Sequence, residues 1–456
     1  MSDTIAAIST AFGEAAISVL RVSGPEAREV LAKVCGGRKT LLELNPRIQH
    51  LGKLVDARGT VIDTVLFTIF PGPASYTGED VVEISCHGGI LVTRRVLEVL
   101  LAAGARAAEP GEFTQRAFLN GKLDLTQAEA VMDLIHAQSE LALQAATQQL
   151  EGRLGQSAER LRGELIHLLA HLEAYIDFPD EDIDPDTGKA LLTRMQSLQG
   201  ELRALLATAE HGRILRSGAR TVICGEPNVG KSSLLNLLTG FERAIVSPVA
   251  GTTRDTIEEM LHIYGLPFRL VDTAGLRQHT SDFIEQHGMD RTRKELTQAD
   301  VILEVVDGSR PAAEAHRVQV PAGQRGHLLI LNKADLGVHE RWRDASGSRQ
   351  EGVRIALSCA TGEGVEALRA AMRDAVWSGE VSANTQVVAI NARHQACFER
   401  AASALQDAAT TFEAGEGTEF VALHVREALQ AVGEVTGRVD VEEVLGAIFS
   451  TFCIGK

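Results

Sequence analysis

One eight-residue segment has the residue types and spacing of a phosphate-binding loop. Residues 225–232 read GEPNVGKS; the apolar run RTVIC before them predicts a buried strand, and SSLLNLLTG, from Ser232 on, predicts a helix start. Backbone N–H groups of such a loop and the N-terminus of the helix bind phosphate oxygens. Lys231 would reach the β- and γ-phosphates, and the hydroxyl of Ser232 would be a ligand of Mg²⁺. The segment predicts a nucleoside triphosphate site, with a chance glycine-rich turn as the alternative.

Two downstream segments bear on the identity of the nucleotide. The tetrapeptide DTAG at 272–275 follows the apolar segment FRLV, so Asp272 would hold Mg²⁺ through water and Gly275 would offer its N–H to the γ-phosphate. The tetrapeptide NKAD at 332–335 follows HLLIL, another buried-strand pattern. The carboxylate of Asp335 can accept hydrogen bonds from N1–H and the exocyclic amine of guanine, a donor pair that adenine lacks. The nucleotide is therefore expected to be GTP.

The remaining parts of this site follow in the order of a Ras-like GTPase domain. The segment SCA at 358–360 can complete the base pocket with backbone N–H groups, and GTTRD at 251–255 lies where a switch loop belongs. Thr253 in that loop is the candidate second hydroxyl ligand of Mg²⁺. The residues expected to contact GTP are Asn228, Val229, Gly230, Lys231, Ser232, Ser233, Ser247, Thr252, Thr253, Asp272, Thr273, Ala274, Gly275, Asn332, Lys333, Asp335, Ser358, Cys359 and Ala360.

Length, charge and cysteine usage limit the class of protein. The chain has 456 residues, enough for two to four domains that each bury a core. Its net charge of −16 argues against a protein that coats nucleic acid through bulk charge, although it is compatible with a local basic face. The six cysteines include no C-x-x-C pair, so neither a disulfide framework nor a zinc site is expected. No signal peptide and no run of ~18 apolar residues is present, and we expect a cytoplasmic protein without membrane contact.

Changes in residue pattern divide the chain into four segments. Residues 1–118 alternate short strands and helices, which indicates an α/β domain. Residues 119–216 and 379–456 have helical periodicity and flank the GTPase domain at 217–378. Because the ends of a compact domain often lie close together, we expect this domain to be an insertion in one discontinuous helical domain, with two separate helical modules as the alternative. The predicted strands include 16–24, 61–70 and 80–86, and the predicted helices include 25–34, 90–104 and 189–211.

Several longer segments resemble one family along the whole chain. They are RVSG at 21–24, SYTGEDVVEISCHGG at 75–89, EPGEFTQRAFLNGKLDLTQAEA at 109–130, FPDEDID at 178–184, AGTTRD at 250–255 and FCIGK at 452–456. Together they are similar to the bacterial tRNA-modification GTPases of the MnmE (TrmE) type. The resemblance implies an N-terminal folate-binding α/β domain that also forms a homodimer, a discontinuous helical domain and an inserted Ras-like P-loop GTPase domain.

The resemblance also implies a reaction, the modification of the wobble uridine of tRNA. The enzyme would act with an FAD-containing partner of the MnmG (GidA) type to add an aminomethyl or carboxymethylaminomethyl group at C5 of that uridine. The one-carbon unit would come from a tetrahydrofolate derivative, in its 5-formyl or methylene form. Hydrolysis of GTP, with Mg²⁺ and K⁺ bound, would drive the cycle.

Four residues match the positions that contact folate in this family: Arg21, Glu83, Lys122 and Lys456. A glutamate can hydrogen-bond the amidine edge of a pterin, and cationic side chains suit the carbonyls and the glutamate tail of folate. From the residues alone, the two cations Arg21 and Lys122 could be surface charges, and Glu83 could be a solvent-facing strand residue. The chain departs from the family at 12–14, where FGE replaces a segment that is more often rich in proline and glycine.

Cys453, four positions from the chain end, is a candidate reactive thiol. The nearby Lys456 would favour its thiolate form. The resemblance implies that this cysteine is needed for modification, as a nucleophile or an acid. The alternative is a small buried residue that packs among Phe449, Phe452 and Ile454.

The expected hydrolysis site lacks the glutamine that many small GTPases use, because leucine occupies position 276. The resemblance implies that a K⁺ ion beside the β/γ-phosphates does the electrostatic work of an arginine finger. It also implies that Glu285 orients the attacking water, at a spacing one residue longer than in some relatives. Arg254 as a finger is the alternative. The expected K⁺ ligands are Asn228, Ser247, Val249 and Thr252.

Two other functions are compatible with parts of the sequence. The AGTTRD switch also occurs in RNA-binding regulatory and ribosome-assembly GTPases, from which the terminal FCIGK and the folate-type N-terminal segment distinguish this chain. A folate-dependent aminomethyl transferase with an added nucleotide switch is the third hypothesis. Arg153, Arg160 and Arg162 form one basic helix face, which could contact tRNA or simply be solvated.

Overall fold

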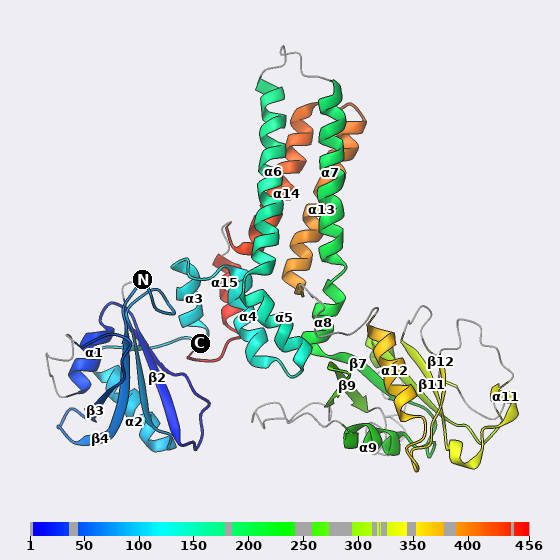
Figure 1. Cartoon of the computed structure of the whole chain (residues 1–456), viewed down its shortest axis with the longest axis horizontal. Helices are drawn as coiled ribbons and strands as arrows, with labels where there is room; N and C mark the ends of the chain where they lie inside the picture. The colour runs from blue at the N-terminus through cyan, green and yellow to red at the C-terminus, as the bar shows by residue number, and fades with distance from the viewer. Residues whose placement is uncertain are drawn as a thin grey trace, which may run out of the picture. The chain divides into compact units, whose positions relative to one another are not determined.

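The computed structural model describes residues 3–35, 44–177, 185–241, 258–272, 294–311, 317–318, 320, 326–343, 353–377, 389–438 and 442–455 (Figure 1). Contacts divide the chain into two compact units. The first unit comprises residues 1–132, 149–200 and 397–456, and the second comprises residues 133–148 and 201–396. In the described part of the chain, no helix combines the length and apolar character needed to cross a membrane.

The N-terminal part of the first unit is a six-stranded sheet with two helices on one face. The strand order is β3-β4-β5-β2-β1-β6. Apolar side chains from alternate strand positions, such as Leu20, Phe67 and Ile84, face α1 and α2 and are at most 1% exposed. The elements confirm the predicted strands and helices of this region. Their bounds are β1 Ile5–Ile8, β2 Ile17–Ser23, α1 Ala27–Val34, β3 His50–Val55, β4 Val61–Phe70, β5 Val81–His87, α2 Ile90–Ala102 and β6 Arg106–Ala107.

The opposite face of this sheet is covered in part: Phe113 and Tyr76 pack over β1, whereas exposed apolar side chains lie along β3 and β4. Leu51 pairs with Leu66 across β3 and β4, and both side chains are exposed, as is Ile17 on β2. Arg21 on β2 and Glu83 on β5 are register partners, so their side chains lie on the same face. Arg21 is four positions after Ile17 on β2, and strand side chains alternate, so this is also the face of Ile17. This face therefore combines an exposed apolar patch with a charged pair that lies against the rings of Tyr76 and Phe113.

Within the first unit, helical segments that precede and follow residues 201–396 pack together. α6 packs along α14, and the ion pair Glu173–Arg426 joins them. Glu159 of α6 also pairs with Arg438, just after the end of α14. The helical pattern of 125–176 is divided into α4, α5 and α6, and the predicted helix 189–211 into α7 and α8. The bounds are α3 Glu112–Leu119, α4 Leu125–His136, α5 Glu140–Leu150, α6 Arg153–Asp177, α7 Pro185–Leu206, α8 Ala209–Ser217, α13 Ala392–Glu413, α14 Thr418–Thr436 and α15 Glu442–Phe449.

The C-terminal segment lies against the N-terminal sheet region of the first unit. Ile454 forms a bridge with Pro110, and the N–H of Gly111 donates to the carbonyl of Cys453 at 3.4 Å. Gly111 has φ +70°, and a Cβ there would lie 2.9 Å from the carbonyl oxygen of Phe449, so only glycine fits. These contacts join residues 110–111 to the C-terminal segment, although the two are far apart in sequence.

The second unit contains a six-stranded sheet of order β12-β11-β10-β7-β9-β8. All neighbours are parallel except β8, which pairs antiparallel with β9. The carboxyl ends of the parallel strands meet at one edge, which is where ligands bind in open α/β sheets. The bounds are β7 Ala219–Cys224, α9 Lys231–Phe241, β8 Glu258–Ile263, β9 Leu266–Asp272, β10 Val301–Asp307, β11 His327–Asn332, η4 Ala334–Leu336, α11 Glu340–Arg343, β12 Val353–Ala356 and α12 Val365–Val376.

Helix α5 contributes to the core of the second unit. Leu141, Ala142 and Ala145 are buried with the apolar residues of β8 and β9. A Cβ placed on Gly265, in the turn between these strands, would meet Leu141 at 3.6 Å, an ordinary packing distance. The segment 133–148 is therefore part of the unit that carries the nucleotide-binding motifs.

Candidate functional site

The phosphate loop connects β7 to α9, as its flanking patterns predicted. Gly225 has φ +141°, and a Cβ there would lie 2.2 Å from the carbonyl oxygen of Val305. Asn228 has φ +64°, a left-handed conformation that asparagine tolerates better than most residues. Lys231 starts α9, and its Nζ donates to the carbonyl of Glu226 at 2.6 Å. The loop thus curls around the ammonium group that would face phosphate.

Asn332 links the phosphate loop to the base-recognition segment. Its Nδ2 donates to the carbonyl of Val229 at 2.7 Å, and its Oδ1 accepts from the N–H of Cys359 at 3.1 Å. The side chain is 3% exposed, and a Cβ on Gly230 would lie 2.1 Å from Nδ2. The side-chain amide of Asn332 therefore donates and accepts within the protein, and it holds the phosphate loop at a fixed distance from the turn at Cys359.

Asp335 is held by Ser358. The Oγ of Ser358 donates to Oδ1 of Asp335 at 2.6 Å, and Ser358 is buried whereas Asp335 is exposed. One carboxylate oxygen of Asp335 is therefore fixed by the protein, while the carboxylate as a whole faces solvent. This arrangement suits recognition of the two donors on the guanine edge. Ala360 follows Cys359 in the same turn and is exposed.

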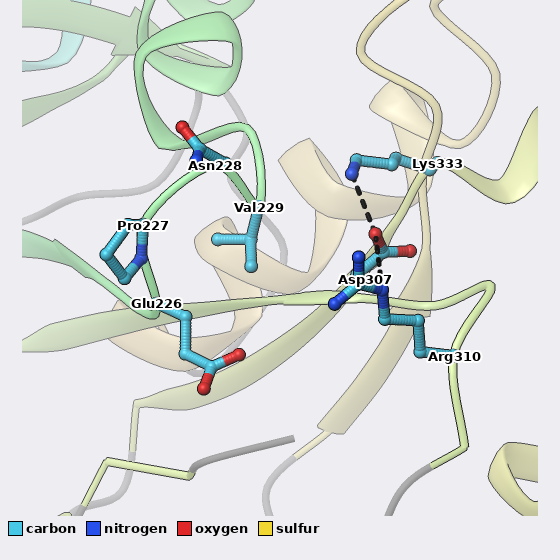
Figure 2. A pocket seen from close by; sticks show the side chains of 7 residues that line it. All are labelled: Glu226, Pro227, Asn228, Val229, Asp307, Arg310 and Lys333. Atoms are coloured by element: carbon cyan, nitrogen blue, oxygen red, sulfur yellow. Dashed lines mark hydrogen bonds and ion pairs between the residues drawn. The ribbon is translucent and has the colours of Figure 1, made fainter. Parts of the chain in front are cut away.

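A polar cavity of about 170 Å³ opens beside the phosphate loop (Figure 2). Residues 226–229 line one side, and Asp307, Arg310 and Lys333 line the other. Nζ of Lys333 donates to Oδ2 of Asp307 at 2.7 Å, the ion pair drawn in Figure 2. Burial alone would raise the pKa of Asp307, but hydrogen bonds from Lys333 and Ser309 outweigh it and lower that pKa. Asp307 is thus held as a carboxylate at neutral pH.

Ser232, an expected ligand of Mg²⁺, and Asp272, expected to hold the ion through water, come from two elements that meet at the sheet edge. Ser232 is exposed in the first turn of α9, and Asp272 is the last residue of β9, opposite Ile223 of β7. Ser233 is also exposed in that turn. The other expected residues lie outside the described part of the chain: Ser247, Val249, Thr252, Thr253, Arg254, Thr273, Ala274, Gly275, Glu285 and Lys456.

Two cysteines of the nucleotide region are poor nucleophiles. Burial raises the pKa of Cys359 to about 11. For Cys224, which directly precedes the phosphate loop, burial and the nearby Glu304 carboxylate raise the pKa to about 12. Both thiols are therefore protonated at neutral pH and act as packing residues.

The first unit brings Arg21 and Glu83 into direct contact. Nε and Nη2 of Arg21 both donate to Oε1 of Glu83, at 3.1 and 2.7 Å. The guanidinium lies over the rings of Tyr76 and Phe113, 5.2 and 5.7 Å from their centroids. Burial raises the pKa of Tyr76, whose hydroxyl lies 2.9 Å from the hydroxyl of Thr114. The pair is therefore a structured, aromatic-lined site, and Glu83 is not an isolated solvent-facing carboxylate.

Lys122 and Cys453 belong to the same unit. Nζ of Lys122 donates to the carbonyl of Pro73 at 3.0 Å, in the loop that also carries Tyr76. Cys453 is exposed, whereas its neighbours Phe449 and Phe452 are 3% and 6% exposed. The alternative that Cys453 is a buried packing residue is wrong, because the aromatic rings occupy the interior and the thiol faces outward.

The sequence did not single out Asp307 or Tyr76. Asp307 ends the apolar strand VILEVVD, and an acidic residue at the end of a buried strand could have marked it as a candidate site residue. Tyr76 lies in a proline- and glycine-rich loop whose path is not encoded by periodicity. Both residues face a site only because the sheet brings distant segments together.

The chain matches two family profiles. One, described as the MnmE helical domain, matches residues 125–453, and the other, the GTP-binding protein TrmE N-terminus, matches residues 4–122. A tRNA modification GTPase MnmE of Akkermansia muciniphila is 53% identical over 456 residues and covers 99% of both chains. Proteins of the same description from Lactobacillus delbrueckii subsp. bulgaricus and Alkaliphilus metalliredigens are 43% and 42% identical over the whole of this chain, and the alignments cover 98% and 100% of those proteins.

The chain belongs to the MnmE family of tRNA modification GTPases. This assignment confirms the family that the sequence resembled and the enzyme class, a GTPase. The MnmE architecture of an N-terminal domain, a helical domain and a G domain is also supported by the two profiles together.

Proposed function

We propose that the chain hydrolyses GTP and, with an FAD-containing partner of the MnmG type, modifies C5 of the wobble uridine of tRNA. The added group would be carboxymethylaminomethyl or aminomethyl, with its one-carbon unit from a tetrahydrofolate derivative. The observation that carries this proposal is a family match over the full chain, together with a polar site in each unit. Because tRNA is the proposed substrate, the expected location is the cytoplasm.

The nucleotide would bind across the phosphate loop and the base-recognition segment of the second unit. The fixed Asn332 bridge and the exposed Asp335 carboxylate support guanine as the base. Mg²⁺ would bind the hard hydroxyl oxygen of Ser232, with Asp272 holding it through water, and would neutralise charge on the phosphates. The unit would be an inserted G domain, since segments of the first unit precede and follow residues 201–396.

A K⁺ ion is proposed beside the phosphates, held in part by Asn228. The exposed side chain of Asn228 and its left-handed backbone in the loop support this assignment, since the amide oxygen is a hard donor. We expect GTP hydrolysis to be faster in K⁺ than in Na⁺ and the Asn228→Ala variant to lose that difference. Equal wild-type rates in the two salts would contradict the K⁺ site.

A tetrahydrofolate derivative is proposed to bind at Arg21 and Glu83. Arg21 engages only Oε1 of Glu83, so the second carboxylate oxygen has no hydrogen bond from that guanidinium and can accept from a pterin. Lys122 and Lys456 would contact the carbonyls and the glutamate tail. The exposed Cys453 belongs to the same unit, which supports a direct role in modification as a nucleophile or an acid.

Homodimer formation through the N-terminal domain is proposed on the exposed apolar part of this sheet face, along β3 and β4. The exposed leucines of β3 and β4 offer an apolar surface beside the Arg21–Glu83 pair. A second copy seated there would cover both features at once.

The test is nucleoside mass spectrometry of bulk tRNA from a strain that lacks this chain. We expect the C5-modified wobble uridines to disappear and to return with wild type but not with Cys453→Ser. Persistence of the modification without the chain would favour the alternative, an RNA-binding regulatory or ribosome-assembly GTPase. Restoration by Cys453→Ser would remove the cysteine from the chemistry and leave the tRNA function in place.

A further inference from the structure

Asp307 occupies a junction of the nucleotide region. It ends β10, and its register partner on β11 is Asn332, the residue that bridges the two recognition loops. Oδ2 accepts from Nζ of Lys333 at 2.7 Å, and Oδ1 accepts from the N–H and Oγ of Ser309 at 3.1 and 2.6 Å. The side chain is only 12% exposed. Its carboxylate is therefore fixed on both oxygens.

Lys333 depends on this carboxylate for its direction. Its backbone is left-handed, with φ +63°, and it leads into the short η4 turn that carries Asp335. Figure 2 shows its side chain reaching toward Asp307 across from residues 226–229 of the phosphate loop. A lysine stem has four rotatable bonds, so the ion pair selects one of many rotamers. The selected rotamer lies along the wall of the cavity.

We propose that Asp307 is a positioning residue for guanine nucleotide binding, which holds the Lys333 stem as the wall between the phosphate loop and the base-recognition segment. The inference rests on the proposed GTP function and adds a residue to that site. Asp307 would act through Lys333, since both of its carboxylate oxygens already accept hydrogen bonds from the protein.

The effect of removing the Asp307 carboxylate on nucleotide affinity distinguishes a positioning role from a simple charge effect. Asp307 is an anion beside a site for an anionic ligand, so its neutralisation by Coulomb's law would tighten nucleotide binding. A positioning role predicts weaker binding, because the freed lysine would leave its place along the cavity. The sign of the change in affinity therefore separates the two roles.

The experiment is a fluorescence titration of the full chain with mant-GDP. We expect the near-isosteric Asp307→Asn variant to bind roughly tenfold more weakly than wild type. Inorganic tripolyphosphate, used as a competitor, should bind Asp307→Asn at least as tightly as wild type, because it engages only the phosphate loop and senses only the loss of the negative charge. Asp374→Asn is the matched control: it removes an exposed carboxylate paired with Arg373 on α12, and it should leave affinity unchanged.

A double-mutant cycle tests the route through Lys333. In a Lys333→Met background, Asp307→Asn should change the affinity less than twofold, since its partner is absent. Equal or tighter binding by Asp307→Asn in the wild-type background would overturn the inference, as would a full additional loss in the Lys333→Met background. If Asp307→Asn does not fold, Lys333→Met alone must still weaken mant-GDP binding, and unchanged binding overturns the inference. Failure of the wild type to bind mant-GDP would instead contradict the proposed GTP function.

Discussion

At the residue scale, one buried carboxylate of the second unit, Glu304, is matched by several partners. Glu304 in β10 is fully buried, yet it accepts from Arg317 at 2.8 and 2.9 Å, from the N–H of Val318 at 2.9 Å, and lies 2.9 Å from Nε2 of His327. An unpartnered carboxylate at this depth would be strongly destabilising. The carboxylate therefore joins the segment around residues 317–318 to the sheet.

The pKa of Glu304 gives a pH-dependent prediction for stability. Burial raises this pKa, but the contacts with His327, Arg317 and Val318 outweigh burial and lower it to about 2 from an ordinary 4.5. Because the carboxyl binds its proton more weakly in the folded state than in the unfolded state, the ionised Glu304 stabilises the fold. This stabilisation is complete above about pH 4.5 and is lost as the pH falls toward 2. We expect this loss to be on the order of 3 kcal/mol in wild type. In Glu304→Gln it should be absent.

The measurement is the free energy of unfolding of the second unit, obtained by chemical denaturation at a series of pH values between 7 and 2. Glu366→Gln is the control, because that glutamate is 69% exposed and pairs with Arg369 at the surface. It should retain the wild-type pH profile. An unchanged profile in Glu304→Gln would show that other carboxylates carry the acid sensitivity.

At the scale of elements, the β8–β9 hairpin is held from two sides. Leu141 of α5 packs on its turn at Gly265, while Tyr264 donates from its hydroxyl to Glu366 of α12 and lies under the guanidinium groups of Arg369 and Arg373. The hairpin connects the two segments expected to sense the nucleotide, 251–255 and 272–275. Helix α5 is thus coupled by packing to the strands between those segments.

Truncation of Leu141 tests this packing. Leu141→Ala should lower the stability of the second unit by about 2–3 kcal/mol, because it leaves a cavity between α5 and the hairpin. Leu143→Ala on the same helix is the control, since Leu143 is 41% exposed and should cost much less. The unfolding transitions of the two variants and of wild type would be compared by urea denaturation monitored by circular dichroism. Similar losses in both variants would mean that α5 is stabilised by helix propensity and not by this contact.

At the scale of the whole molecule, the two candidate sites belong to different units of one chain. The Arg21–Glu83 pair and Cys453 lie in the first unit, and the nucleotide motifs lie in the second. Each unit has its own sheet, so each site is built on a separate core. The proposed homodimer would join two copies of the chain through the exposed apolar face of β3 and β4.

A charge placed on that face tests the homodimer. Leu66→Glu should convert the dimer to a monomer, because burying an unpaired carboxylate in an apolar interface is costly. The mass would be measured by size-exclusion chromatography with light scattering. Leu423→Glu is the control: that leucine is 58% exposed on α14 and should not affect assembly. A dimeric Leu66→Glu protein would place the interface elsewhere.

Local chemistry determined much of this protein from the sequence alone. The phosphate loop, NKAD and the strand alternation of β2, β4 and β5 are encoded over a few residues, where glycine conformations and side-chain periodicity act directly. The family was also recognisable, since its motifs are short and contiguous.

Tertiary structure decided the partners that those motifs contact. Asp307 and Lys333 are 26 residues apart, and Arg116 reaches Asp3 across 113 residues. Likewise, the division of one helical pattern into α4, α5 and α6, with α5 in the core of the second unit, depends on which surfaces it buries. Such pairs are set by strand order and by competition for a common core, and no local window of sequence contains that information.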